Sequence, residues 1–259
     1  MNLSIFLQYF HIIDFLNKLK FVITKNQLKF IKGLSFKKNR INHKCFVVEG
    51  EKSILELLAS DFEIIDLYAT HSWNTKTDLV EITQITNNEL IRISSLKSPN
   101  KVLAVVKIPI VKLENKGGVT LVLDSINDPG NLGTIIRLCD WFGVQQIICS
   151  KDTVDIYNTK VIQASMGSVF RVNLVYTNIK DYLQKVNTPI YGAFMDGSNI
   201  KEMKFPKDIH LILGNESNGV SKEVASLITN KIAIKSIGFK TESLNVAMAT
   251  AIFLYEISA

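Results

Sequence analysis

The sequence predicts an α/β protein in which a smaller α/β domain precedes a mostly parallel sheet. From residue 119 onward, short apolar stretches rich in Val and Ile alternate with helical patterns, as in sheets covered by helices on both faces. The 259 residues are 47% hydrophobic and 21% charged, which is typical of a globular protein. The segment LENKGG places two glycines between apolar stretches. We therefore expect domains at residues 23–112 and 119–259, joined by a linker at 113–118.

Residues 1–22 are interpreted as a separate N-terminal extension. Their apolar residues recur at helical spacing, but Asp14, Lys18 and Lys20 interrupt the pattern. No apolar run reaches the ~18 to 20 residues that a membrane span needs, and the start lacks a signal-peptide pattern. We expect either a packing helix or an upstream segment outside the native fold, and no membrane association.

The first domain begins with a helix and a basic loop in ITKNQLKFIKGLSFKKNR. A strand at 46–50, a helix at 51–59, and strands at 63–70 and 101–110 are expected to follow. Residues 18–52 carry ten basic and two acidic side chains, a net charge of +8. Such an excess is typical of phosphate-binding surfaces, although a lysine-rich solvated surface is the alternative.

The second domain is predicted to alternate strands with helices. Strands are expected at 119–124, 145–149, 172–176, 189–195, 210–214 and 231–235. Helices are expected at 131–142, near 158–166, at 178–186, near 221–228 and at 243–258. The final helix is apolar nearly all round, which predicts burial in a core or in a subunit interface.

Three turns follow strands of this domain, where ligands of parallel sheets bind. In DPGNLGTIIR, we expect Asn131 to cap the next helix and Arg137 to lie opposite its buried stripe. In LILGNESNGVS, two glycines flank Glu216. A solvated arginine and a plain left-handed turn are the respective alternatives.

The third turn leads into the final helix through KSIGFKTESLN. Ser243 is placed to cap that helix, and Asn245 is a polar residue on an otherwise apolar element. A capping serine and an asparagine bonded within the core are the alternative to a ligand site. Neither a phosphate-binding P-loop nor a GxGxxG pattern is present in these turns.

The sequence shows no pattern of a metal site or of a catalytic nucleophile. The three cysteines and four histidines show no metal-ligand spacing, and no Ser-His-Asp order appears. We therefore expect no metal. An odd number of cysteines without a framework favours a reducing compartment, hence the cytoplasm.

Taken together, the three turns resemble the SpoU/TrmH branch of the SPOUT RNA methyltransferases. DPGNLGTIIR, LILGNESNGVS and SLNVAMATAIFLYE are similar to its three motifs, and QASMGSVFRV to an intermediate stretch. KKNR, FVVEGEK and SPNKVLAVVKIP resemble the small substrate-binding domain that often precedes the catalytic one. The resemblance covers about residues 23–257.

The resemblance implies transfer of a methyl group from S-adenosyl-L-methionine to a ribose 2′-hydroxyl of rRNA or tRNA, with rRNA favoured by the auxiliary domain. It also implies a C-terminal trefoil knot, a homodimer and a ribosomal-protein-like, RNA-binding first domain. Asn131 and Gly133 would shape a turn that presents Arg137 to the substrate. Arg137, Asn131 and Glu216 would face the ribose. Arg137 is described in the family as a general base, but a guanidinium stays protonated, so it is expected to stabilise charge, with Glu216 as an alternative base.

The resemblance also assigns binding residues. The cofactor would be bound by Leu213, Gly214, Asn215, Ile234, Ser243, Leu244, Asn245 and Met195, with Phe194 nearby. The RNA-binding residues would be Lys37, Lys38 and Arg40.

Three departures from the family pattern affect the cofactor pocket. They are Ser217 and Lys235, which stand where glycine and proline are common, and an apparent one-residue insertion between Ile234 and Leu244. A non-catalytic RNA- or ribosome-binding protein on the same fold is the alternative function.

Overall fold

The computed structural model describes residues 23–75, 77–114, 117–238 and 243–258. They form two compact units that divide between Ile108 and Pro109, and each is described by itself. The helix expected within residues 1–22 lies outside the described residues. In the ranges given above, no helix is long and apolar enough to cross a membrane.

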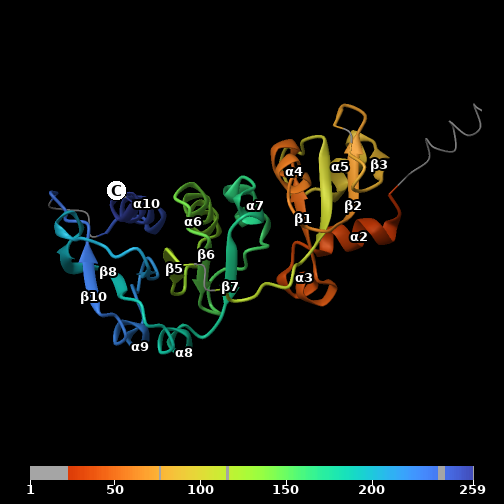
Figure 1. Ribbon diagram of the computed structural model, residues 1–259. Coiled ribbons are helices and arrows are strands. Elements are labelled where there is room, and N and C mark those ends of the chain that lie inside the picture. Colours follow the sequence, from red (N-terminus) through yellow and green to blue (C-terminus); the bar gives the residue numbers. More distant parts are fainter. Residues whose placement is uncertain (1–22, 76, 115–116, 239–242, 259) are drawn as a thin grey trace, which may run out of the picture. The chain divides into compact units, whose positions relative to one another are not determined.

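The first unit is built on a four-stranded sheet in the order β1-β4-β2-β3. Strand β4 pairs antiparallel with both β1 and β2, and β3 pairs parallel with β2. The strands are β1 (Cys45–Glu49), β2 (Ile64–Thr70), β3 (Ile82–Ile85) and β4 (Val102–Lys107). The helices are α2 (Lys25–Gly33), α3 (Lys37–His43), α4 (Glu51–Leu58) and α5 (Asn87–Ile93) (Figure 1).

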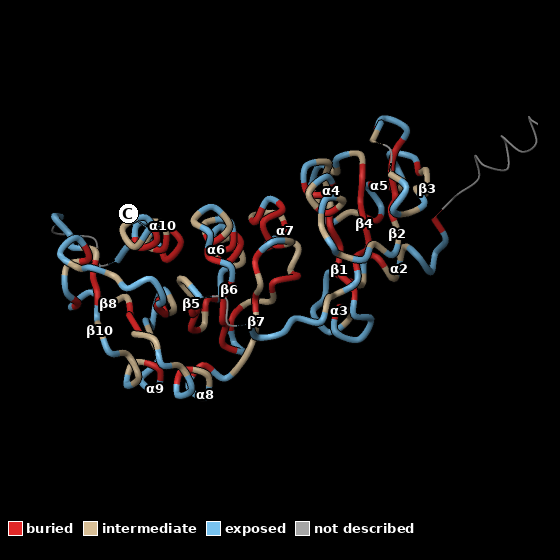
Figure 2. Tube along the Cα trace, in the orientation of Figure 1, coloured by how far each residue is buried: buried red, intermediate tan, exposed pale blue. Residues whose placement is uncertain are grey.

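Local sequence signals fix two helix starts in this unit. Thr24 and Gln27 form a capping box at the start of α2, and Thr86 and Glu89 form another at α5. Glu89 also accepts a hydrogen bond from the backbone N–H of Ile23 at 3.1 Å, which ties the entry of α2 to α5. Residues of α2, α5 and all four strands of this sheet then share one apolar core. Figure 2 shows this burial along the strands.

Two segments of this unit differ from the expected pattern of elements. The basic segment beginning at Lys37 was expected to be a loop but forms helix α3. Strand β3 and helix α5 lie in the stretch between the second and third expected strands, where no element was predicted. Their short length gives too few periods for a clear pattern.

The second unit contains a six-stranded sheet in the order β10-β8-β9-β5-β6-β7. All five strand pairings are parallel, as the alternating pattern predicted. The strands are β5 (Val119–Leu123), β6 (Gln146–Cys149), β7 (Asn173–Tyr176), β8 (Ile190–Asn199), β9 (Ile209–Leu213) and β10 (Asn230–Ala233).

Helices cover both faces of this sheet (Figure 1). Helices α10 (Val246–Ser258), α6 (Pro129–Trp141) and α7 (Thr159–Ser165) lie in a row, with α6 in contact with both neighbours. Helices α8 (Ile179–Leu183) and α9 (Lys222–Ala225) lie on the other side and share an apolar core with the strands. Because β5 and β9 are adjacent and parallel, the loops that follow them meet at one edge.

Helix α10 is not buried all round within a single chain. Phe253 and Leu254 are buried, whereas Met248 and Tyr255 are 62% and 64% exposed. Met248, Ile252 and Tyr255 follow the i, i+4, i+7 spacing of one helix face. The helix was predicted to be buried in a core or in a subunit interface. Within one chain, the core buries one face of α10 and leaves the face with Met248, Ile252 and Tyr255 exposed.

Candidate active site

The loop after β5 is held against the loop after β9. Buried Asp124 accepts a hydrogen bond from the Ser221 N–H at 2.8 Å. Ser125 adopts a left-handed backbone, with φ of 61°, and its carbonyl accepts from the Asn215 side chain at 2.8 Å. A serine in this region is strained, and such strain is typical of functional sites. The two loops thus form one structure before any ligand is considered.

Helix α6 is capped by Asp128, not by Asn131 as expected. The Asp128 carboxylate accepts the Asn131 backbone N–H at 2.7 Å, and Pro129 occupies the first turn, where its missing N–H costs nothing. Asn131 is the third residue of the helix, within its first turn. Its carboxamide is therefore available for contacts with other loops.

Asn131 joins the loop after β9 to the segment that leads into α10. Its side-chain N–H donates to the Glu216 carboxylate at 2.6 Å, and its side-chain oxygen accepts from the Asn245 amide at 2.9 Å. The three residues come from α6, the loop after β9 and the start of α10. The structure therefore brings together three of the predicted site residues in one polar chain.

Asn245, not Ser243, caps the final helix. The Asn245 side-chain oxygen accepts from the backbone N–H groups of Ala247 and Met248 at 3.0 and 3.3 Å. One carboxamide thus caps the helix through its oxygen and reaches Asn131 through its nitrogen. The prediction of Ser243 as the cap was wrong by two residues, because both residue types suit the position.

The loop after β9 is a closed turn built by Asn215. Its side-chain oxygen accepts from Ser217 and Asn218, and its backbone pairs in both directions with Gly219. Ser217 does not have a positive φ, so serine replaces the family's glycine there without backbone strain. The loop thus keeps Glu216 exposed beside Asn131 despite this departure.

Gly214 and Gly133 serve close packing. A Cβ on Gly214 would lie 2.2 Å from the Gly219 carbonyl carbon, so the loop closes only around glycine. A Cβ on Gly133 would lie 2.5 Å from that of Ala164 on α7. Gly133 therefore allows α7 to approach α6, and the expectation that it shapes the preceding turn was wrong.

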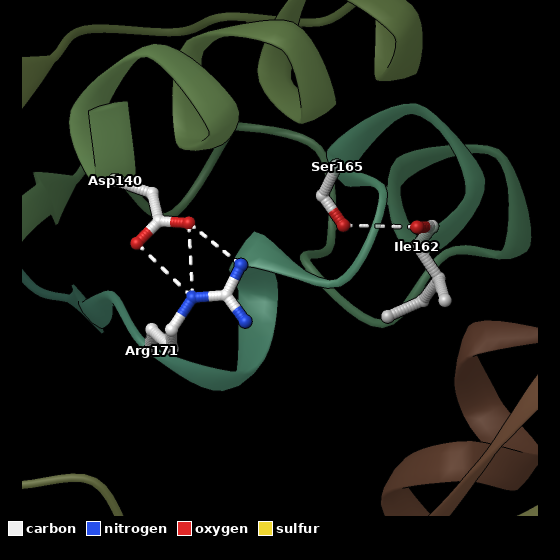
Figure 3. Close-up of polar contacts among 4 residues, drawn as sticks. All are labelled: Asp140, Ile162, Ser165 and Arg171. Atoms are coloured by element: carbon white, nitrogen blue, oxygen red, sulfur yellow. Dashed lines mark hydrogen bonds and ion pairs between the residues drawn. The ribbon is translucent and has the colours of Figure 1, made fainter. Parts of the chain in front are cut away.

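The stretch after α7 is fixed to the end of α6. Figure 3 shows the Arg171 guanidinium facing the Asp140 carboxylate, with a 2.7 Å contact from Nη2, and Ser165 donating to the Ile162 carbonyl at 2.9 Å. Burial would raise the pKa of Asp140, but hydrogen bonds from Arg171 and Ser168 and the charge of Arg171 lower it. The contact between Arg171 and Asp140 therefore fixes the C-terminal end of α6.

Arg137 lies apart from the polar chain. It is exposed, six residues along α6 from Asn131, which corresponds to about 9 Å along the helix axis. Among the residues that the structure places, none forms a hydrogen bond or ion pair with its guanidinium. Trp141, one turn further and 83% exposed, shares its face. Arg137 is thus displayed outward beside an uncovered aromatic side chain.

The expected cofactor residues lie at the end of β9, within β8, just after β10 and just before α10. The side chain of Leu213 is buried, Ile234 is half-buried, and Leu244 and Met195 are 49% and 63% exposed. Met195 lies where β8 leaves its pairing with β10, between Gly192 and Ser198. Of the residues assigned to the cofactor, Asn245 donates a hydrogen bond to Asn131.

Two further contacts shape this region. Lys231 approaches the Phe194 ring at 4.6 Å. Lys235, which stands where the family often has proline, donates to the Gly197 carbonyl at 2.7 Å. The lysine that stands in place of the family's proline therefore adds a contact between the ends of β8 and β10.

The three predicted RNA-binding residues separate into two kinds. Lys37 and Lys38 are exposed. Arg40 is 2% exposed, and its guanidinium donates to the carbonyls of Leu34 and Ser35 at 2.8 Å each. The expectation that Arg40 lies on a phosphate-binding surface was wrong, because these carbonyls hold its side chain in the interior.

The chain was compared with known families and proteins. Residues 118–255 match the SpoU rRNA Methylase family, and residues 25–104 match the MRM3-like substrate binding domain. The chain belongs to the SpoU rRNA methylase family. It is 30% identical over 241 residues to the 23S rRNA (guanosine(2553)-2'-O)-methyltransferase RlmP of Bacillus subtilis, covering 90% of this chain and 96% of that protein.

Solved structures of similar proteins have the same fold as this SpoU chain. A TrmH-family protein from Porphyromonas gingivalis superposes with a TM-score of 0.84 at 36% identity, over 91% of this chain and 98% of the other. The AdoMet-bound rRNA methyltransferase from Sinorhizobium meliloti gives 0.80 at 26% identity, over 91% and 96%. In the part of this SpoU chain that the structure describes, no three His, Cys, Asp or Glu residues are grouped as metal ligands.

Sequence reasoning missed three residues that build this SpoU site. Asp128 caps α6, and Asp124 fixes the loop after β9. Ser125 supplies the left-handed backbone turn after β5. The Asp-Pro pair at 128–129 was a readable helix-start signal. Nothing in the sequence marks the positive φ of Ser125, because serine rarely adopts it.

Proposed function

We propose that the protein transfers a methyl group from S-adenosyl-L-methionine to a ribose 2′-hydroxyl of rRNA. The hydrogen-bonded chain of Glu216, Asn131 and Asn245 carries this proposal, because it joins the three loops that match the family's motifs. The relatives support the same class, since RlmP of B. subtilis is named a 23S rRNA 2'-O-methyltransferase. The substrate-binding domain favours rRNA over tRNA.

The residues assigned to the cofactor fit its adenine ring. Met195 and Leu244 expose apolar side chains and Ile234 is half-buried, which suits the faces of an adenine ring. Gly214 offers backbone groups after β9, and Asn215 closes the loop that follows by pairing its own backbone with Gly219. We propose these residues, with Leu213, Ser243 and Asn245, as the binding set. When bound, S-adenosyl-L-methionine supplies a methyl group on a sulfonium that is already reactive.

The chain's own residues then position and stabilise the ribose. Glu216 is exposed and oriented by Asn131, so it is placed to accept the proton of the 2′-hydroxyl. Arg137 remains protonated, and its free guanidinium would neutralise the adjacent phosphate and the developing oxyanion. Correct positioning of the hydroxyl supplies much of the remaining acceleration.

We propose that a homodimer completes the site. The α10 face formed by Met248, Ile252 and Tyr255 is apolar and uncovered, and Trp141 on neighbouring α6 is 83% exposed. Burying such a face against a second copy removes it from water. Arg137 shares the face of Trp141, so the same contact would bring it toward the site of the partner chain.

The proposal extends to domain roles and location. Residues 23–112 would bind RNA, residues 119–259 would form the methyltransferase domain, and residues 113–118 would link them. A C-terminal trefoil knot stays a prediction from the family. All three cysteines carry free thiols, which suits the reducing cytoplasm in which rRNA is modified.

A methyl-transfer assay tests the function. Purified protein is incubated with S-adenosyl-L-methionine carrying a radioactive methyl group and with rRNA from a strain lacking the gene. We expect label in the RNA, and none with the variant Arg137→Ala. A folded protein that binds this rRNA without labelling it would support the alternative, a non-catalytic RNA-binding protein.

A further inference from the structure

Phe36 is displayed in the turn between α2 and α3. Its side chain is 69% exposed, although phenylalanine is usually buried. It lies outside the apolar core shared by α2, α5 and the strands of its unit. The core therefore gives no reason for an aromatic residue at this position.

The turn that carries Phe36 is held rigidly. The Phe36 N–H donates to the Gly33 carbonyl at 3.1 Å, and its own carbonyl accepts from the Arg40 N–H at 3.2 Å. The buried Arg40 guanidinium holds the carbonyls of Leu34 and Ser35. An exposed aromatic residue on an ordered turn loses little entropy when it binds a partner.

The surroundings of Phe36 are uniformly basic. Residues 24–44 contain six lysines and Arg40 but no Asp or Glu. Lys25, Lys29 and Lys32 are exposed at the i, i+4, i+7 spacing of one α2 face, and Lys37 and Lys38 directly follow Phe36. A polyanion is the partner that this charge favours.

We propose that Phe36 stacks on an unpaired base of the RNA substrate while Lys37 and Lys38 bind the neighbouring phosphates. This inference rests on the proposed function and assigns a role to a residue outside the methyltransferase domain. Proteins recognise single-stranded RNA by stacking bases on aromatic side chains within a basic surface. Paired bases in a helix are not accessible to such a side chain, so the surface selects unpaired RNA.

Binding of two probes by the full-length chain tests the proposal. The probes are a labelled single-stranded oligouridine and an RNA duplex of the same length. We expect Phe36→Ala to weaken oligouridine binding about tenfold and duplex binding less than twofold, and Phe36→Trp to retain both. Ile91→Ala is the control, because Ile91 is 60% exposed on α5 and should affect neither.

Salt dependence and crosslinking separate stacking from charge. Phe36→Ala should leave the salt slope unchanged, whereas replacing Lys37 and Lys38 by Gln should reduce it by about 1.4, or ~0.7 for each phosphate contact. Ultraviolet crosslinking to oligouridine should modify the peptide that contains Phe36.

The proposal fails under three results. They are wild-type affinity of Phe36→Ala for oligouridine, equal losses on both probes, and a changed oligomeric state of that variant, which would indicate a protein contact. None of these readouts requires methyl transfer. A chain that binds oligouridine through Phe36 but methylates no RNA would overturn the proposed function and leave this inference standing.

Discussion

The side-chain amide of Asn131 lies 2.6 Å from a carboxylate oxygen of Glu216, although 85 residues separate the two. Asn131 also accepts a hydrogen bond from Asn245, so one carboxamide orients a candidate base and contacts the cap of the final helix. The site therefore depends on a residue whose own helix is capped by another, Asp128.

Loss of the Asn131 carboxamide should impair methyl transfer more than folding. We expect Asn131→Ala to lower kcat about a hundredfold, because Glu216 loses the donor that orients it. Steady-state methyl transfer to rRNA measures the change. Thr134→Ala is the control, since Thr134 lies exposed on the same helix and its hydroxyl donates to the Gly130 carbonyl. If both variants were equally active, Asn131 would have no role in methyl transfer.

Arg137 and Glu216 should act across the subunit interface. Arg137→Ala and Glu216→Gln homodimers should both be inactive, while their co-refolded mixture should recover activity, because each heterodimer contains one site with both native residues. Methyl transfer by the separate and mixed variants measures this. A mixture as inactive as its parents, with heterodimers demonstrated, would place both residues in the same chain's site.

The uncovered face of α10 should be required for dimerisation. Met248 and Tyr255 are exposed and apolar in the single chain, so Tyr255→Lys should place a charge inside the proposed interface. We expect this variant to sediment as a monomer in analytical ultracentrifugation, with most activity lost. The control Leu55→Lys changes an exposed residue on α4 and should remain dimeric. If the Tyr255→Lys protein remained dimeric, the dimer interface would not include this face of α10.

His210 should make the protein less stable in mild acid. It is buried between the Tyr182 and Thr188 hydroxyls, each 2.7 Å from a ring nitrogen, and burial lowers its pKa from 6.5 to about 4. Between these values the unfolded chain binds a proton that the folded chain excludes. Stability from this group is therefore complete above pH 6.5 and falls as the pH drops toward 4.

Urea unfolding at pH 7 and pH 4.5 measures this effect. Between them, the free energy of unfolding should fall by about 2 kcal/mol more in the wild type than in His210→Gln. The comparison between variants removes the contribution of carboxylates, which also titrate in this range. An identical pH dependence in the two proteins would show that His210 is protonated without cost in the fold.

Arg40 should contribute to stability, in contrast to its lysine neighbours. Arg40→Met would leave the carbonyls of Leu34 and Ser35 without their donor, and we expect a loss of about 2 to 4 kcal/mol in the free energy of unfolding. Lys38→Gln, at an exposed position, should change it by less than about 0.5 kcal/mol. Similar values for the two variants would contradict the buried role of Arg40.

Much of the second unit could be predicted because its strands are buried and short, with helices between them. The parallel sheet and the meeting of the loops after β5 and β9 follow from that alternation. The turns that carry Asn131, Glu216 and Asn245 were also found from sequence, because they follow strands of such a sheet, and the family resemblance assigned these residues to the site. Their mutual hydrogen bonds depend on loop geometry that no periodicity encodes.

The errors share one physical cause, which is that residue type does not settle local role. Arg40 resembles its lysine neighbours in charge but reaches inward to two carbonyls. Asn131 and Ser243 are suitable capping residues, yet Asp128 and Asn245 occupy those positions. Gly133 sits near a turn but is required by the approach of α7. Each outcome is decided by tertiary contacts.

Mapping the transferred methyl group tests the account most directly. A ribose 2′-O-methyl group protects the following phosphodiester from alkali, so rRNA treated with the protein and S-adenosyl-L-methionine can be hydrolysed and its resistant positions read. We expect a resistant bond with the wild-type protein and none with Arg137→Ala or Asn131→Ala. Methyl transfer to a base, which leaves every bond alkali-sensitive, would contradict the assignment of these residues to the ribose.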